Sequence, residues 1–242
     1  MKKLIKAYIV LPCYNEEDVL NETCKQLLNV FEQMQNDGLI TSDSRIVFVD
    51  DGSKDRTWNI IESLQKQHTQ VCGIKLAHNV GHQNALFGGL MSVKDKCDCA
   101  VSIDADLQDD IYAIPEMIRK FRDEECEIVY GVRNKRETDT FFKRTTALGF
   151  YKLMKIMGVD MVYNHADYRL MGKNALDALS EFNERNLFLR GMIPLIGYKS
   201  DCVYYDRKER FAGKSKYPLK KMLSFAFDGI TSFSINPIRM IS

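Results

Sequence analysis

Short apolar segments alternate with amphipathic ones along the first half of the chain. Apolar residues recur every three or four positions between the apolar runs, as at Leu20, Cys24 and Leu27, which predicts helices. The runs themselves are five residues long and rich in β-branched residues, which predicts buried strands. Strands that alternate with helices predict an α/β fold, with a mostly parallel sheet covered by helices on both faces. The expected strands are 7–11, 46–50, 72–76, 99–103 and 127–131.

The second half of the chain is less regular. Its patterns predict helices near 139–157, 173–182 and 216–234, and a strand near 198–205. The last helix has an apolar stripe that includes Leu219 and Phe233, so it either faces the core or lies on a membrane surface.

A polar motif follows each of the first four expected strands. These motifs are "PCYNEE", "DDGSKD", "AHNVGHQNA" and "DADLQDD", in chain order. Parallel strands end at the same edge of a sheet, and ligands of such sheets bind there. The four motifs therefore predict one site.

Composition narrows the class of protein. The 242 residues are 45% hydrophobic and 28% charged with a net charge of +1, which is typical of one globular domain and gives no reason to expect a nucleic-acid partner. The seven cysteines are odd in number and scattered, so we expect reduced thiols in a cytosolic compartment. We expect neither a signal peptide nor a transmembrane span within the chain. Segment 206–221 nevertheless carries a net charge of +5.

The acidic residues of two motifs have competing interpretations. Asp104 and Asp106 either cap the next helix or share a divalent cation, which would offset their repulsion. Asp50 and Asp51 stand at a strand end, where a carboxylate can accept hydrogen bonds from a base or a ribose. The chain has no GxGxxG or GxxxxGK[ST] motif, so a nucleotide diphosphate would have to be held in another way, such as by a cation.

Five motifs in order, "VLPCYNEE", "VDDGSKDRT", "NVGHQNAL", "DADLQDD" and "RFAGKSKY", resemble glycosyltransferase family 2, the inverting nucleotide-sugar enzymes of GT-A fold. "DADLQ" with the late "AGKSKY" resembles the subgroup that glycosylates polyprenyl phosphates, which includes dolichol-phosphate mannose synthase and bacterial undecaprenyl-phosphate glucosyl- and N-acetylglucosaminyltransferases. The resemblance implies a GT-A catalytic domain over 1–205. It also implies a basic acceptor loop and an amphipathic, membrane-interface helix over 206–242.

The resemblance also implies residue roles on the donor side. Asp104 and Asp106 would hold Mg²⁺ or Mn²⁺ against the sugar diphosphate, with Gln108 as a third ligand. Asp109 and Asp110 are expected to cap a helix and to be solvated. His78 and His82 are expected to be loop or helix-start residues and not metal ligands. The residues implied for the base and ribose pocket are Pro12, Tyr14, Glu16, Asp50 and Asp51.

On the acceptor side, the resemblance implies a cationic phosphate site. Asp167 is placed among the catalytic residues, where we expect it to orient the sugar or the acceptor; a general-base role and an ion pair with Arg169 remain alternatives. The implied phosphate-binding residues are Arg133, Arg144, Arg210, Lys214 and Ser215.

The expected partners are a nucleotide-sugar donor, a polyprenyl phosphate acceptor and the cytoplasmic membrane surface. The oligomeric state is left open, a homo-oligomer included. We expect the chain to be truncated, with transmembrane helices beyond residue 242. The expected donor is UDP-glucose or UDP-N-acetylglucosamine, and GDP-mannose is the alternative. Two other hypotheses are transfer to a glycan or lipid hydroxyl and an inactive GT-A domain that binds a nucleotide sugar or scaffolds a membrane complex.

Overall fold

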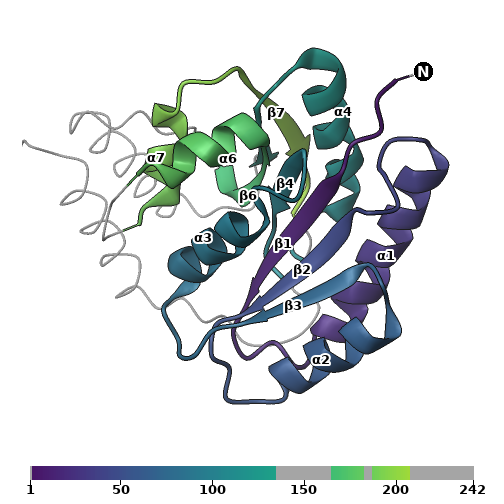
Figure 1. Cartoon of the computed structure of the whole chain (residues 1–242), viewed down its shortest axis with the longest axis vertical. Coiled ribbons are helices and arrows are strands. Elements are labelled where there is room, and N and C mark those ends of the chain that lie inside the picture. Colours follow the sequence, from purple (N-terminus) through teal and green to yellow (C-terminus); the bar gives the residue numbers. More distant parts are fainter. Residues whose placement is uncertain (1, 135–164, 183–186, 208–242) are drawn as a thin grey trace, which may run out of the picture.

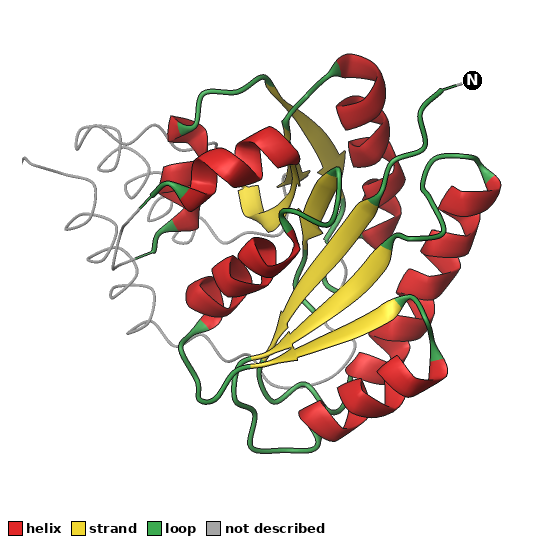
Figure 2. Ribbon diagram, viewed as in Figure 1, coloured by secondary structure: helices red, strands yellow, loops and turns green. Residues whose placement is uncertain are grey.

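A seven-stranded sheet forms the centre of the computed structural model, which describes residues 2–134, 165–182 and 187–207 (Figures 1 and 2). Within these residues the strand order is β3-β2-β1-β4-β6-β5-β7. The strands are β1 (Ala7–Cys13), β2 (Arg45–Asp50), β3 (Val71–Lys75), β4 (Cys99–Ser102), β5 (Ile128–Arg133), β6 (His165–Gly172) and β7 (Ser200–Tyr205).

Helices cover both faces of this sheet. In Figure 1 the helices α1, α2 and α4 lie on one face and α3, α6 and α7 on the other. The described helices are α1 (Leu20–Asn36), α2 (Thr57–Gln67), α3 (His82–Val93), α4 (Ile114–Glu124), α6 (Lys173–Ser180) and α7 (Leu189–Leu195), with a short 3₁₀ helix η1 (Ile111–Ala113) before α4.

Alternation along the strands divides the core into two layers. Ile9 and Leu11 of β1 pack in the layer beneath α1, α2 and α4, whereas Val10 between them packs in the layer beneath α3. Successive side chains of a strand point to opposite faces, so a strand covered on both faces has to be apolar throughout. This architecture confirms the expected α/β fold with a mostly parallel sheet.

The direction of the strands brings several loops to one edge of the sheet. β1 is parallel to β2 and to β4, and Cys13 pairs with Asp50 at the ends of β1 and β2. β6 runs antiparallel to β4, and the pairing of Ser102 with Arg169 brings the start of β6 to the end of β4. The polar motifs after β1, β2 and β4 therefore meet the beginning of β6.

The expected helices near 139–157 and 216–234 lie outside the described residues. No helix in the described part of the chain is long and apolar enough to cross a membrane. All seven cysteines are free, as expected.

Candidate active site

The loops that follow β1 and β2 are joined by hydrogen bonds. Asn15 has a left-handed backbone (φ 53°), its amide nitrogen donates to Ser53 Oγ at 3.0 Å, and its side-chain oxygen accepts from the Lys54 amide at 2.8 Å. The Glu16 amide donates to Thr57 Oγ1 at 2.8 Å. "PCYNEE" and "DDGSKD" thus form one structural unit.

Asp50 at the end of β2 is fully buried, and one of its oxygens lacks a partner. Oδ1 accepts a hydrogen bond from the Ser53 amide at 3.2 Å, but the buried Oδ2 has no hydrogen-bond partner. A buried acceptor without a partner is destabilising, so it marks a place where a ligand N–H or O–H could bind. On the neighbouring strand end and loop, Pro12 is buried, and Tyr14 and Glu16 are half-buried. This arrangement can hold a nucleoside.

Asp51, expected in the same pocket, holds the loop that follows β3. Its carboxylate accepts from Asn79 Nδ2 at 2.8 Å and from the Val80 and Gly81 amides at 2.7 and 3.1 Å. These three donors engage both oxygens. Asp51 therefore fixes the loop that leads into α3 at His82.

The "DADLQ" loop after β4 is held in an unusual backbone conformation. Leu107 has φ 57°, which is uncommon for a residue other than glycine, and such strained conformations cluster at functional sites. Thr23 of α1 donates to the Ala105 carbonyl at 2.7 Å, and Asp106 Oδ1 accepts from the Gln108 amide at 3.1 Å. Asp104 is half-buried, whereas Asp106 is buried.

The charges around Asp104 fit a cation. Burial raises the pKa of Asp104 to about 6; His82 opposes this shift, and the nearby carboxylates, Asp109 first among them, add to it. A divalent cation would stabilise the charged form. Carboxylate and amide oxygens are ligands that Mg²⁺ and Mn²⁺ accept, so Asp104, Asp106 and Gln108 suit such an ion. The Gln108 side-chain oxygen also accepts a hydrogen bond from Arg207.

Asp109 is buried, so the expectation that it is solvated is wrong. Arg133 at the end of β5 pairs with Asp109 at 2.9 Å, and the Tyr205 hydroxyl donates to the same oxygen at 2.7 Å. These partners lie on β5 and β7, 24 and 96 residues after Asp109 in the sequence. Asp110 precedes η1 as expected, but its side chain makes no capping hydrogen bond. Arg133, expected to bind phosphate, is three-quarters buried against Asp109.

Asp167 near the start of β6 is surrounded by donors. Arg169 Nη2 donates to it at 2.7 Å, Arg190 donates from Nε and Nη2 at 3.2 Å each, and Gln83 Nε2 donates at 3.2 Å. The ion pair with Arg169 is thus present. Burial alone would raise the pKa of Asp167, but Arg190, His82 and Arg169 hold it well below the usual range. A carboxylate with such a low pKa is a poor general base near neutral pH.

His82 links Asp167 to the "DADLQ" loop. Its Nε2 lies 3.5 Å from Asp104 Oδ1 and 3.5 Å from Asp167 Oδ2. Burial lowers the pKa of His82, but the hydrogen bond to Asp167 and the charge of Asp104 raise it to about 9. His82 begins α3 as expected, yet its contacts with both carboxylates were missed. The only signal in the sequence is its place after a strand end.

Four of the expected acceptor residues cannot be placed. They are Arg144, Arg210, Lys214 and Ser215, which lie outside the described residues.

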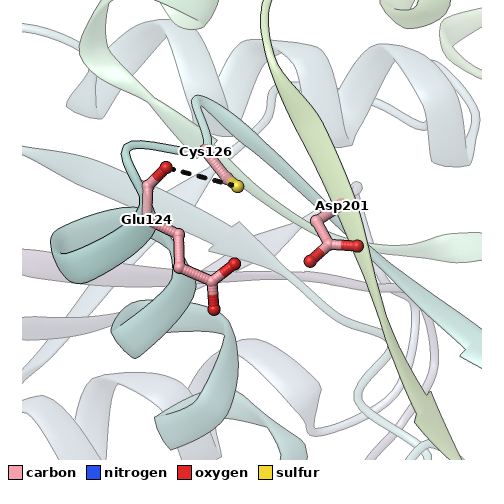
Figure 3. A group of neighbouring side chains, drawn as sticks. All are labelled: Glu124, Cys126 and Asp201. Atoms are coloured by element: carbon pink, nitrogen blue, oxygen red, sulfur yellow. Dashed lines mark hydrogen bonds between the residues drawn. The ribbon is translucent and has the colours of Figure 1, made fainter.

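A second group of potential metal ligands lies elsewhere in the described structure. Glu124, Cys126 and Asp201 have ligand atoms within 4.8 Å of one another, with Asp201 on β7 facing the end of α4 (Figure 3). Lys120 Nζ already pairs with Asp201 at 2.5 Å and with Glu124 at 3.6 Å. Burial raises the pKa of the Cys126 thiol, which disfavours the thiolate that a metal would need. We therefore regard Glu124 and Asp201 as ion-pair partners of Lys120 and not as metal ligands.

The sequence matches a family model and several curated proteins. The model of glycosyl transferase family 2 matches residues 8–180. An uncharacterized glycosyltransferase of Bacillus subtilis, YkoT, is 60% identical over 234 residues, which are 97% of this chain and 69% of that protein. The bactoprenol glucosyl transferase of Shigella phage SfX is 37% identical over 237 residues, 98% of this chain and 75% of that protein.

Solved structures share the fold. Glucosyl-3-phosphoglycerate synthase from Mycobacterium tuberculosis, in complex with Mn²⁺, UDP and phosphoglyceric acid, has a TM-score of 0.60 and 14% identity, covering 94% of this chain and 77% of that one. The mannosyltransferase PcManGT from Pyrobaculum calidifontis, in complex with GDP-Man and Mn²⁺, has a TM-score of 0.59 and 17% identity, covering 94% and 70%. At these identities the likeness shows the fold alone.

Proposed function

Since the chain belongs to glycosyl transferase family 2, we propose that it transfers a hexose from a nucleotide sugar to a polyprenyl phosphate, with inversion at the anomeric carbon. The observation that carries this proposal is the 37% identity with the phage bactoprenol glucosyl transferase, which extends over 98% of the chain. The proposed donor is UDP-glucose or UDP-N-acetylglucosamine, and GDP-mannose is the alternative.

The donor nucleoside binds at the ends of β1 and β2 in this proposal. The unpartnered Oδ2 of Asp50 accepts a hydrogen bond from the base or the ribose, which explains why a buried carboxylate oxygen is left without a partner. Pro12, Tyr14 and Glu16 line the same pocket. Asp51 contributes indirectly by fixing the loop after β3.

The sugar diphosphate lies over the "DADLQ" loop. Asp104, Asp106 and Gln108 would hold a Mg²⁺ or Mn²⁺ ion there. When bound, this ion would supply the counter-charge for the diphosphate. The raised pKa of Asp104 supports the assignment, since burial disfavours the charged carboxylate and a bound cation would offset that cost.

The acceptor needs little activation. An oxygen of its phosphate forms the bond to the anomeric carbon while the bond from that carbon to the diphosphate oxygen breaks, and the nucleoside diphosphate leaves with the electron pair. A phosphate monoester is mostly ionised at pH 7, so no general base is required. The donors around Asp167 support an orienting role for that carboxylate.

The basic segment brings the site to the membrane. Segment 206–221 carries a net charge of +5, and each Lys or Arg near an anionic surface contributes about 1 kcal/mol of attraction. The proposed location is the cytoplasmic face of the membrane. We therefore expect the chain to bind anionic vesicles weakly and in a salt-sensitive way, which co-sedimentation at low and high salt measures. Absence of binding at both salt concentrations would contradict this part of the proposal.

A donor screen tests the proposed function. The chain is incubated with undecaprenyl phosphate and labelled UDP-glucose, UDP-N-acetylglucosamine or GDP-mannose, and lipid-bound label is counted. Label from one UDP-sugar is the expected result. Label from GDP-mannose alone would favour the mannosyltransferase, and label in no lipid would contradict the proposal.

A further inference from the structure

Asp167 has two arginine partners, Arg169 and Arg190, although one of them is enough to neutralise its charge. Asp167 is paired with Arg169 at 2.7 Å, and the two side chains are 8% and 1% exposed. Arg190 adds a second guanidinium to the same carboxylate, and its side chain is 37% exposed. Asp167, Arg169 and Arg190 together carry a net positive charge, and Arg190 is the most exposed of the three side chains.

The first turn of α7 holds Arg190 in a fixed position. The backbone amide of Leu189, the preceding residue, donates to Gln83 Oε1 of α3 at 3.0 Å. Its carbonyl accepts from Arg169 Nη1 of β6 at 3.4 Å. Asp167 then fixes the guanidinium itself through Nε and Nη2. A side chain held in place in this way loses little entropy when it binds a ligand.

Arg190 also lies at the edge where the diphosphate is expected. The Asp167 oxygen that accepts from Arg190 Nη2 lies 3.5 Å from His82 Nε2, and that nitrogen is 3.5 Å from Asp104. The Asp167 carboxylate and the His82 imidazole therefore connect Arg190 to Asp104 of the "DADLQ" loop.

We propose that Arg190 is a phosphate-binding residue of this site and that Asp167 positions it. The inference rests on the proposed function and extends it to a residue outside the motifs. A guanidinium donates to two phosphate oxygens at once, which gives binding strength and orientation together. The bound phosphate belongs either to the donor diphosphate or to the acceptor monoester.

Two variants of Arg190 test the proposal. Arg190→Gln removes the charge. Arg190→Lys keeps the charge but loses the planar guanidinium that can donate to two phosphate oxygens at once. The nucleoside diphosphate that the parent binds, UDP or GDP, is titrated with Mn²⁺ present, and the KM for undecaprenyl phosphate is measured. We expect one of these two constants to rise roughly tenfold to a hundredfold in Arg190→Gln and less in Arg190→Lys.

The two binding constants identify the phosphate. A raised Kd for the nucleoside diphosphate assigns Arg190 to the donor, and a raised acceptor KM with an unchanged Kd assigns it to the acceptor. Arg119→Gln is the matched control, since Arg119 pairs with Asp37 on another surface of the protein, and both constants should stay unchanged. Parent-like values of both constants in either folded Arg190 variant would overturn the proposal.

Asp167→Asn tests the positioning role. The variant keeps the size of the side chain but weakens its hold on Arg190, so it should raise the same constant as Arg190→Gln. The double variant should be no worse than the more affected single variant, because the two residues act as one unit. A loss confined to kcat would overturn the positioning role. A parent that neither binds a nucleoside diphosphate nor transfers sugar would instead contradict the proposed function.

Discussion

A Cβ atom on Gly52 would lie 2.6 Å from the carbonyl carbon of His78, so the turns that follow β2 and β3 are packed backbone against backbone. Gly52 also has φ 66°, a conformation that side chains disfavour. We predict that Gly52→Ala lowers the free energy of unfolding by roughly 2–4 kcal/mol, from backbone strain plus the clash.

Urea denaturation measures this loss, and Gly38→Ala is the control. Gly38 has φ 62°, but a Cβ there would meet nothing within 4 Å. Its substitution should cost only the strain, about 1–2 kcal/mol. Equal losses in both variants would show that the two turns are not tightly packed.

Tyr205 and Tyr204 are neighbours on β7 with opposite surroundings. The Tyr205 hydroxyl donates to Asp109 at 2.7 Å and accepts from Arg133 Nε at 3.3 Å, whereas Tyr204 is 67% exposed. We predict that Tyr205→Phe lowers the free energy of unfolding by about 1–3 kcal/mol, because Asp109 and Arg133 each lose a hydrogen bond while their ion pair remains. Tyr204→Phe should change it by less than about 0.5 kcal/mol. Thermal unfolding of the two variants compares them, and an equally stable Tyr205→Phe would contradict the network.

The "DADLQ" carboxylates should be required for transfer. Asp104→Asn or Asp106→Asn should lower the transfer rate by roughly 10²- to 10³-fold, about 3–4 kcal/mol, because the leaving diphosphate loses its counter-charge. Both variants should also bind donor less tightly with Mn²⁺ present, which calorimetry measures. Near-normal turnover of either variant, together with a parent unaffected by EDTA, would rule out the cation.

Donor and acceptor sites should respond to different substitutions. Asp50→Asn replaces a carboxylate with an amide of the same shape, so it should raise the donor Kd by roughly tenfold or more. Lys214→Ala, on the proposed acceptor side, should leave that Kd unchanged and raise the KM for the lipid. If both variants lost donor binding equally, the division of the site would be wrong.

Much of the sheet is predictable because its central strands are apolar on both faces. The exception is β6, whose sequence "HADYRLMG" looks like a polar loop. Its charged residues Asp167 and Arg169 neutralise each other within the fold, a pairing that hydrophobic patterning cannot reveal. Helix α7 was also missed, since it has only seven residues and contains Pro194.

The part of the site that can be predicted from the sequence consists of the motifs that directly follow parallel strands. The motifs after β1, β2 and β4 come together because parallel strands end at one edge. The contacts of His82 and Arg190 with Asp167 were missed because they join residues that lie far apart in the sequence. Asp109 was misjudged for the same reason, since it lies in the loop after β4 and its partner Arg133 is at the end of β5.

The central claim is that a phosphate accepts the sugar. The most direct test offers the chain labelled nucleotide sugar with undecaprenyl phosphate or with undecaprenol, its counterpart that lacks the phosphate, and counts label in the lipid. We predict that undecaprenyl phosphate is labelled and undecaprenol is not. Equal labelling of both lipids, or labelling of undecaprenol alone, would contradict the account and favour a transferase that acts on hydroxyl groups.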